Sequence, residues 1–237
     1  MKDYKFDNTD DVMLLARIAE QSEQYDDMID ILKPHFESRK DGDLTSEERN
    51  VLCVAYKNAV GMRRIAWRAA EKARSIPKYN KLFEAEMRQY SKKLEEELVN
   101  LCKDMLNLIT KHLLPKAKKA QHAESEVFFL KLQGDYFRYV AEVGDGDRLE
   151  KATERCLDCY NRASERAEEA GLSPADPTRL ALLLNFAVFC HETLQQRDQA
   201  RQMASEAYEQ AMVEIGALDK SKAQEAANVL EFIRENI

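Results

Sequence analysis

The sequence contains little glycine and proline, with only 7 Gly and 5 Pro among 237 residues. This scarcity excludes collagen-like and low-complexity chains, and a hydrophobic content of 44% excludes a fully disordered one. The sequence also lacks a membrane-spanning run, because the longest apolar stretch, 180–190, is interrupted by Asn185 and is shorter than the roughly 18 residues required. We therefore expect a globular chain that is long enough to bury a core without a disulfide or a metal.

The sequence has no excess of positive charge, since 36 Lys and Arg stand against 43 Asp and Glu, a net charge of −7. This balance argues against a protein that binds nucleic acid by neutralising many phosphates, so any anion site is local. The first ten residues lack the basic and then apolar pattern of a signal peptide. We expect no membrane insertion and a cytoplasmic protein that can also enter the nucleus.

The sequence also lacks the signatures of a metal site or an enzyme. Its five cysteines are odd in number, and Cys156-x-x-Cys159 has no second cysteine pair or histidine pair at zinc spacing. It has no Gly-rich phosphate loop and no nucleophile elbow. We therefore expect no metal, no cofactor and no catalytic residues.

Good helix formers fill the long stretches between the prolines. Between residues 94 and 108, Leu and Met recur every third or fourth residue, which is the spacing of one helix face. Thr45 with Glu48 has the capping-box pattern, and Asp176 before Pro177 predicts a second helix start. The basic segment after Leu114 is expected to form an exposed loop. We predict an all-α fold with helices near residues 9–22, 25–39, 46–75, 80–114, 123–143, 147–170, 177–194, 198–215 and 221–237.

Two of the predicted helices carry a stripe of basic residues on one face. The first stripe consists of Lys57, Arg64 and Arg68, and the second consists of Lys131 and Arg138, where Tyr139 adds a phenol beside the guanidinium. Each helix contains a glycine, Gly61 or Gly134, at a cost of roughly 1 kcal/mol relative to alanine. We hypothesise that these glycines permit close helix approach, so that the cations converge on a phosphate dianion. The alternative is that carboxylates such as Asp135 neutralise them as ordinary surface pairs.

A third helix, from residue 177 to 194, carries a polar line in an apolar surround. Asn185 and Glu192 are seven residues apart, and Leu184 and Val188 lie beside them. The Asn185 amide can both donate and accept hydrogen bonds, so it could hold the main chain of an extended ligand. It could equally be satisfied within the helical bundle.

Four segments of the sequence resemble the 14-3-3 family: A-E-Q-S-E-Q-Y-D-D-M at 19–28, V-A-Y-K-N-A-V-G-M-R-R-I-A-W-R at 54–68, A-E-S-E-V-F-F-L-K-L-Q-G-D-Y-F-R-Y-V-A-E at 123–142 and L-N-F-A-V-F at 184–189. The resemblance implies a single domain of nine antiparallel helices that form a cup-shaped protomer with an amphipathic groove. In such a protein residues 1–75 contain the dimerisation part and the basic helix, and residues 76–237 form the groove. It implies a homodimeric adaptor without enzymatic activity, which binds phosphoserine or phosphothreonine segments of client proteins in signalling.

The resemblance also implies roles for individual residues. The matching phosphate-binding residues are Lys57, Arg64, Arg138 and Tyr139, with Arg68 and Lys131 nearby. The matching peptide-backbone and groove residues are Asn185, Asn236, Glu192, Leu184, Val188 and Val229.

Several residues depart from the family pattern. Larger apolar residues are typical at Ala69, Ala70 and Ala73, and an arginine is usual at Gln24, so we expect a weakened dimer. Asn228 and Phe232 replace smaller aliphatic groove residues and are expected to alter the preference for residues that flank the phosphosite.

The alternative to a phosphopeptide-binding adaptor is a tetratricopeptide-like scaffold that binds unmodified peptides. Residues 185–194 and 200–211 combine small and large side chains in the way that is typical of such a helix pair. No 34-residue period recurs elsewhere in the sequence, which counts against it.

Overall fold

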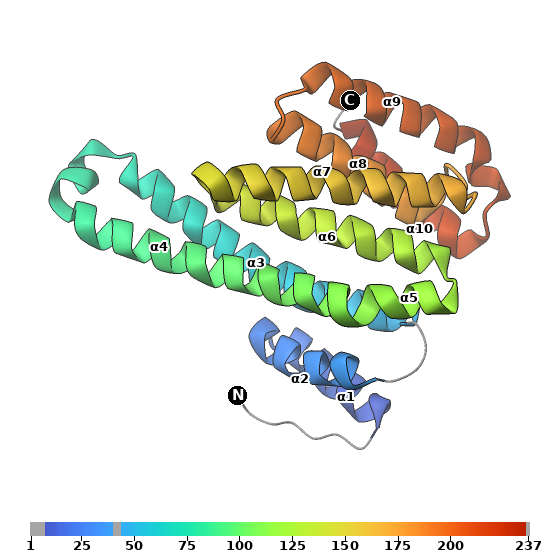
Figure 1. Cartoon of the computed structure of the whole chain (residues 1–237), viewed down its shortest axis with the longest axis horizontal. Coiled ribbons are helices and arrows are strands. Elements are labelled where there is room, and N and C mark those ends of the chain that lie inside the picture. Colours follow the sequence, from blue (N-terminus) through green and yellow to red (C-terminus); the bar gives the residue numbers. More distant parts are fainter. Residues whose placement is uncertain (1–7, 40–43, 236–237) are drawn as a thin grey trace. The chain divides into compact units, whose positions relative to one another are not determined.

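The computed structural model describes residues 8–39 and 44–235, and the side chains of 80–82 are left out of the description. The described residues form helices and contain no strand, so the all-α prediction is confirmed. No helix among them is long and apolar enough to cross a membrane. The elements, labelled in Figure 1, are α1 (Thr9–Gln21), α2 (Tyr25–Ser38), α3 (Ser46–Arg74), α4 (Pro77–Leu108), the π-helical turn η1 (Ile109–Leu113), α5 (Leu114–Ala120), α6 (Ala123–Val143), α7 (Gly146–Glu169), α8 (Pro177–Glu192), α9 (Arg197–Glu214), the 3-10 turn η2 (Ile215–Ala217) and α10 (Lys220–Glu235).

The chain divides into two compact units, residues 1–116 and 117–237. In the first unit, α3 and α4 pack along each other as a long antiparallel pair (Figure 1), and α1 and α2 pack together and against α3. The predicted capping box at the start of α3 is present. Glu48 N donates to Thr45 Oγ1 at 3.2 Å, and Thr45 N donates to Glu48 Oε2 at 2.8 Å. The two bonds satisfy backbone donors that the first turn of a helix leaves unpaired.

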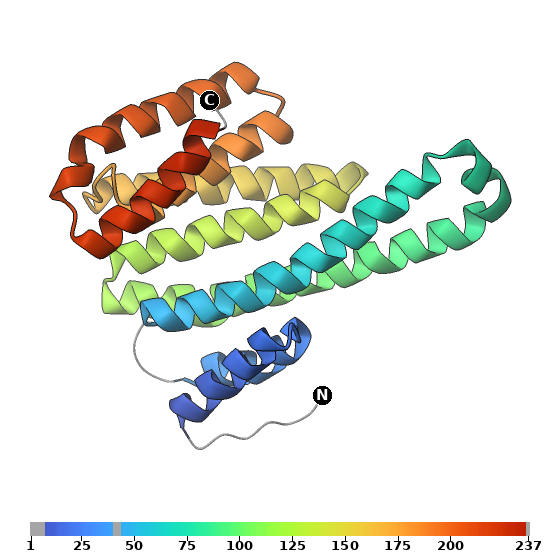
Figure 2. The same ribbon diagram turned by 180° about the vertical axis from the view of Figure 1, so that it is seen from behind.

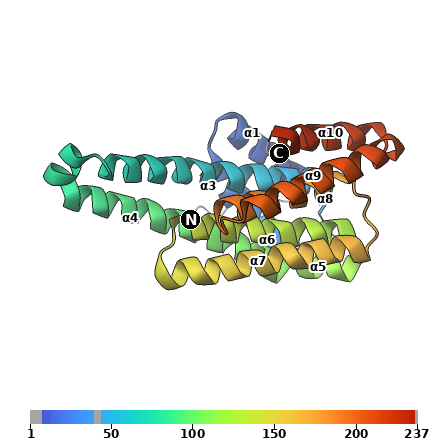
Figure 3. The same ribbon diagram turned by 90° about the horizontal axis from the view of Figure 1, so that it is seen from above.

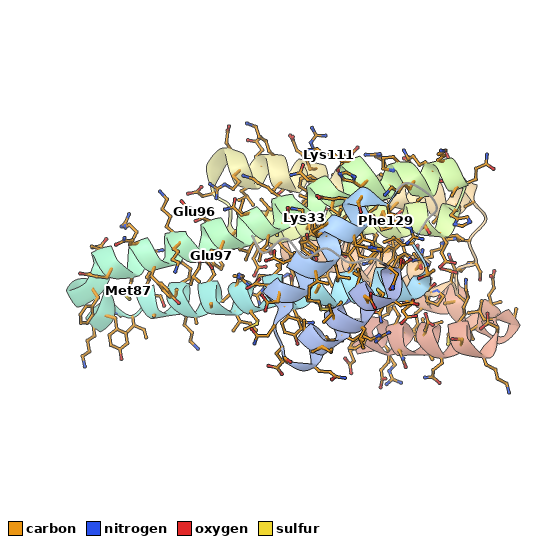
Figure 4. The ribbon with its side chains drawn as sticks, turned by 90° about the horizontal axis from the view of Figure 1, so that it is seen from below. Lys33, Met87, Glu96, Glu97, Lys111 and Phe129 are labelled. Carbon is orange, nitrogen blue, oxygen red and sulfur yellow. The ribbon has the colours of Figure 1, made fainter. Side chains whose placement is uncertain are left out.

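The aspartate Asp104 of α4 joins three helices of this unit. Tyr56 of α3 donates its hydroxyl to Asp104 Oδ2 at 2.7 Å, and Lys33 of α2 forms an ion pair with Asp104 Oδ1. Nearer the N-terminal end of α4, Lys93 pairs with Glu97 at 3.7 Å on the exposed charge-dense face. Figure 4 shows Lys33 on α2 and Glu97 on α4. The charged residues of α4 therefore have two roles. Asp104 joins neighbouring helices, whereas Lys93 and Glu97 lie on the face that is exposed to solvent.

The prediction of an exposed loop after Leu114 is wrong, because η1 and α5 continue the helical path of α4 to Ala120. In η1, Leu114 N–H donates to Ile109 O, the longer-ring bond of a π-helix. This change of register comes directly before Pro115, which has no N–H to contribute. Leu114 and Ala117 are buried, and Lys116 Nζ donates to Phe36 O at 3.0 Å. Burial of one face therefore keeps this basic segment helical.

In the second unit, α6 and α7 pack side by side along most of their length (Figure 3). α8 packs against α9, and α10 packs against both of them, as the view from behind in Figure 2 shows. Tyr160 of α7 lies at the centre of this unit. Its ring stacks on Phe186 of α8 at 5.3 Å between centroids, and the ring is fully buried.

The cysteines of the second unit behave as core residues. Cys156 and Cys159 are buried, and the Cys156 thiol lies 3.3 Å from Gly134 O. Burial raises the pKa of Cys159 to about 11 and raises that of Cys156 above its ordinary range. Thiols with raised pKa values are poor nucleophiles and poor metal ligands at neutral pH. Among residues 8–39 and 44–235, no cluster of three potential metal ligands occurs.

Candidate functional site

The basic residues of α3 lie on its solvent side. Lys57 and Arg68 are exposed and Arg64 is partly exposed, whereas Tyr56 and Ala59 are fully buried on the other side. The spacing of 7 and 4 residues places the three cations on one helix face. The sequence-predicted stripe on this helix is therefore present and accessible to a ligand.

The predicted close helix approach differs between the two glycines. A Cβ at Gly61 of α3 would meet no atom within 4 Å, so the packing of its own unit does not require a glycine there. The approach of α3 to α6 stays a prediction, because the two helices belong to different units. A Cβ at Gly134 of α6 would lie 2.6 Å from Cε1 of Tyr160. Gly134 thus permits close packing of α6 against the Tyr160 ring of α7, and its role in the site is indirect.

The space at Gly134 lets Tyr160 reach Asp135, which is the centre of a buried hydrogen-bond network. Tyr160 Oη donates to Asp135 Oδ1 at 2.6 Å, and Asn185 Nδ2 of α8 donates to the same oxygen at 2.7 Å. Lys131 Nζ donates to Asp135 Oδ2 at 2.7 Å. Only 4% of Asp135 is exposed. One carboxylate therefore fixes side chains from α6, α7 and α8.

Asp135 is held in its charged form. Burial alone would raise its pKa, but the nearby charges of Lys131 and Arg138 and the hydrogen bonds from Lys131 and Tyr160 hold the pKa below the ordinary value. The ion pair with Lys131 is itself largely buried. Lys131 is thus engaged by Asp135, and its predicted place near the phosphate stays a prediction.

Arg138 lies one turn beyond Asp135 on α6. Its Nε atom is buried and has no hydrogen-bond partner among the described protein residues. The guanidinium carbon lies 4.9 Å from the centroid of the Tyr139 ring, which allows a cation–π contact. Burial works against the charge, but Tyr160, Asp135 and Tyr139 outweigh burial and raise the pKa of Arg138. Arg138 is therefore a permanently charged, partly buried donor.

The alternative that Asp135 neutralises the basic residues of its helix holds for Lys131, with which it forms a largely buried ion pair, but an ordinary surface pair between Asp135 and Arg138 is not present. Asp135 is buried, and the hydrogen bonds it accepts come from Lys131, Tyr160 and Asn185. Asp135 attracts the guanidinium across a distance but does not take up its Nε donor.

Asn185 combines the two roles that the sequence left open. One N–H of its amide is satisfied within the bundle by Asp135. Because a carboxylate only accepts, this bond also sets which end of the amide is Nδ2. The side chain is partly exposed, and its Oδ1 and second N–H have no hydrogen-bond partner among residues 8–39 and 44–235. They can bind the main chain of a ligand.

The predicted groove residues Leu184, Val188 and Glu192 line one cavity of about 250 Å³ between α8 and α9. Val229 of α10 is half-buried and does not line this cavity, and Asn236 lies outside the described residues. The cavity also contains two arginines that we did not predict, Arg197 and Arg201 of α9. Their spacing of four residues on one helix face is the signal that could have identified them.

The predicted phosphate-binding residues divide between the two compact units. Lys57 and Arg64 belong to the first unit, and Arg138 and Tyr139 belong to the second. Their convergence on one phosphate therefore stays a prediction. Within the second unit, the network of Asp135 holds Asn185 on α8, and Arg138 lies a turn further along α6.

Comparison with known proteins gives a consistent result along nearly the whole chain. Residues 15–237 match the sequence model of the family described as "14-3-3 protein". The chain is 38% identical over 230 residues to a "14-3-3 protein homolog" of Trichoderma harzianum, covering 96% of this chain and 86% of that protein. It is 38% identical over 231 residues to "14-3-3-like protein 2" of Caenorhabditis elegans, covering 98% of this chain and 91% of that protein. It is 37% identical over 230 residues to "Checkpoint signal transducer rad24" of Schizosaccharomyces pombe, covering 96% and 83%.

Proposed function

Because the chain belongs to the 14-3-3 family, we propose that it binds phosphoserine or phosphothreonine segments of client proteins and regulates these clients in signalling. Members of the family are adaptors rather than enzymes. The observation that carries the proposal is the buried, unpartnered Nε of Arg138, one turn along α6 from the carboxylate that orients Asn185. Arg138, which can donate hydrogen bonds to an anion, and Asn185, which can bind a peptide main chain, thus lie in the same unit of the fold.

The chemistry of Arg138 and of the exposed cations of α3 suits a phosphate. A phosphoserine brings a charge of roughly −1.5 to −2 and three strong acceptor oxygens, whereas an unmodified serine brings no charge. Hydrogen bonds to charged groups contribute about 1.5–3 kcal/mol each. Binding therefore depends on phosphorylation of the client.

Each site residue has a proposed role that follows the family resemblance. The proposed phosphate-binding residues are Lys57, Arg64, Arg138 and Tyr139, with Arg68 and Lys131 nearby. The proposed peptide-backbone and groove residues are Asn185, Asn236, Glu192, Leu184, Val188 and Val229. We propose that the protein acts in the cytoplasm and can also enter the nucleus.

We also propose a homodimer that is formed by the first 75 residues and the neighbouring part of α4. Large apolar side chains are exposed there, among them Leu14 on α1, Ile65 on α3 and Phe83 on α4. Ile65 is 70% exposed, an unfavourable state for a large aliphatic side chain that a partner would relieve. The exposed Ala69 contributes little apolar area, which supports a weak dimer. Sedimentation at micromolar concentrations tests this: a mass of about 27.4 kDa at every concentration would exclude the dimer.

Fluorescence polarisation tests the proposed function. A labelled Arg-x-x-phosphoserine-x-Pro peptide and its unphosphorylated twin are titrated with the wild type and with Arg64→Glu and Arg138→Glu. We expect tight binding of the phosphopeptide alone, and its loss in both variants, with circular dichroism to show that the variants fold. Arg162→Glu, an exposed arginine of α7 paired with Asp158, is the matched control. Equal binding of the twins would favour the scaffold for unmodified peptides.

A further inference from the structure

The cavity between α8 and α9 has an apolar floor and a charged rim. Leu184 and Val188 of α8 face Ala200 and Ala204 of α9 across it. Glu192, Arg197 and Arg201 contribute the charge at its edge. Ala200 and Ala204 are small, so their short side chains leave room in the space that a larger pair of residues would fill.

The two arginines of the rim, Arg197 and Arg201, form no ion pair among the described residues. Both are exposed, and neither forms a side-chain hydrogen bond within the part of the chain that the structure describes. Against them stands the single negative charge of Glu192, so the rim carries a net charge of about +1. The chain as a whole has a net charge of −7, so this positive rim differs from its average surface. A negatively charged ligand group complements the rim.

The N-terminus of α9 adds to the positive potential. The helix begins at Arg197, and the residue before it, Gln196, makes no side-chain cap hydrogen bond to the first turn. The amide groups of an uncapped first turn carry a partial positive charge that favours anions. Asp198 in the same first turn offsets part of this potential, so most of the positive charge at the rim comes from Arg197 and Arg201.

The distance from Asn185 limits which part of a client can reach the cavity. Val188 and Glu192 lie three and seven residues beyond Asn185 on the same helix, or about 4.5 and 10.5 Å along its axis. An extended peptide advances roughly 3.3 Å per residue. A client whose main chain is held at Asn185 therefore reaches the cavity within about one to three further residues.

We propose that this cavity is a specificity subsite, which takes an apolar side chain of the client on its floor and a neighbouring Asp or Glu on Arg197 and Arg201. The inference rests on the proposed function, because the bound phosphosegment brings these residues to the cavity. The occupant is a client segment that is acidic and apolar within about four residues of its phosphorylated residue. Such a segment is selected over one of the same length without the carboxylate.

Competition with a peptide panel tests the subsite. The panel keeps one phosphoserine, moves a Leu-Asp pair through the positions up to four residues on each side, and includes the Leu-Asn counterpart of every member. At one position we expect the Leu-Asp peptide to bind roughly fivefold more tightly than its Leu-Asn counterpart, the size of effect that partly exposed ion pairs give. Arg197→Gln with Arg201→Gln should remove this preference and leave the affinity for Leu-Asn peptides within about twofold.

Matched variants separate charge at the cavity from charge elsewhere. Arg155→Gln with Arg162→Gln makes the same change of net charge on exposed residues of α7 and should preserve the preference. Glu192→Gln should increase it, because the one opposing charge of the rim is removed. A preference that is absent at every position, or that survives loss of both rim arginines, would overturn the subsite.

The outcomes also distinguish the subsite from the proposed function. If the phosphorylated and unphosphorylated peptides bind equally, the phosphate-dependent function itself fails. If binding requires the phosphate but Leu-Asp and Leu-Asn peptides never differ, only the subsite fails.

Discussion

Each of the two units contains an aspartate that joins three helices. Asp104 accepts from Tyr56 of α3 and pairs with Lys33 of α2, and Asp135 accepts from Tyr160 of α7 and pairs with Lys131 on its own helix. The side chain of Asp104 is 28% exposed and that of Asp135 is 5% exposed. Similar donor sets therefore occur at very different depths.

The two aspartates also differ in whether they contact a candidate ligand-binding residue. Asp135 also orients the partly exposed amide of Asn185 and lies one turn from Arg138. Asp104 joins α2, α3 and α4 of the first unit, and neither of its partners, Tyr56 and Lys33, is a predicted site residue. The partly exposed Asp104 thus stabilises packing, whereas the buried Asp135 also orients an amide that can bind a ligand.

The largest expected effect comes from removing each carboxylate in turn. Asp135→Ala leaves Lys131, the buried Tyr160 hydroxyl and the partly exposed Asn185 amide without an acceptor, and it should cost about 3–5 kcal/mol of unfolding free energy. Asp104→Ala, in a partly solvated position, should cost about 1–2 kcal/mol. Urea unfolding measures both.

Phosphopeptide affinity distinguishes the roles of Asp104 and Asp135. Of the variants that remain folded, Asp104→Ala should keep the affinity of the wild type, whereas Asp135→Asn should weaken it through the disturbed amide of Asn185. Equal stability losses in the two alanine variants would contradict the assignment of depth as the deciding factor.

Replacing the glycine of each basic helix by alanine should change the free energy of unfolding by a smaller amount, and the change should have opposite signs in the two units. Gly134→Ala places a Cβ 2.6 Å from the buried Tyr160 ring and should destabilise the fold by about 1–3 kcal/mol. Gly61→Ala meets no atom within 4 Å and should stabilise α3 by about 0.5–1 kcal/mol. Thermal and urea unfolding of the two variants measure the difference, and two changes of the same sign would refute the packing role of Gly134.

The smallest effect is the pH dependence that Asp135 adds. Its pKa is lower in the folded protein than the ordinary 3.8, so the stability it contributes is present above that value and is lost as the pH falls through the folded pKa. The gap in unfolding free energy between the wild type and Asp135→Asn should be constant above about pH 5 and narrow below about pH 3.8. Urea unfolding at a series of pH values measures the gap. A gap that widens on acidification would show that Asp135 is protonated in the fold.

Much of the fold could be predicted from local patterns. The capping box at Thr45, the cap and proline at Asp176–Pro177 and the apolar series on α4 all correspond to observed helices. The prediction failed after Leu114, since a proline and several lysines there suggested a loop. The residues that decide the outcome, Leu114 and Ala117, are buried by contacts that local patterns do not contain.

The candidate site could be predicted only in part. The family resemblance and the helix spacing selected Arg138, Tyr139, Asn185 and the wall residues as candidates, and their roles stay predictions. They missed Tyr160, which looked like one more core aromatic, and the pair Arg197 and Arg201, which looked like ordinary surface charge. Hydrogen-bond partners and cavities join residues that are distant in sequence, so spacing along one helix does not report them.

The helical character of this protein, its family and the helix faces that carry its cations can all be recognised from the amino-acid sequence, because they follow from 3.6-residue periodicity and from motifs that lie within single helices. The packing of the helices was needed to show that Gly134 makes room for Tyr160 while Gly61 faces open space, and that one buried carboxylate binds Lys131, Tyr160 and Asn185. These features depend on burial. A charge that is removed from water must find its partners among whichever helices the packing brings to it.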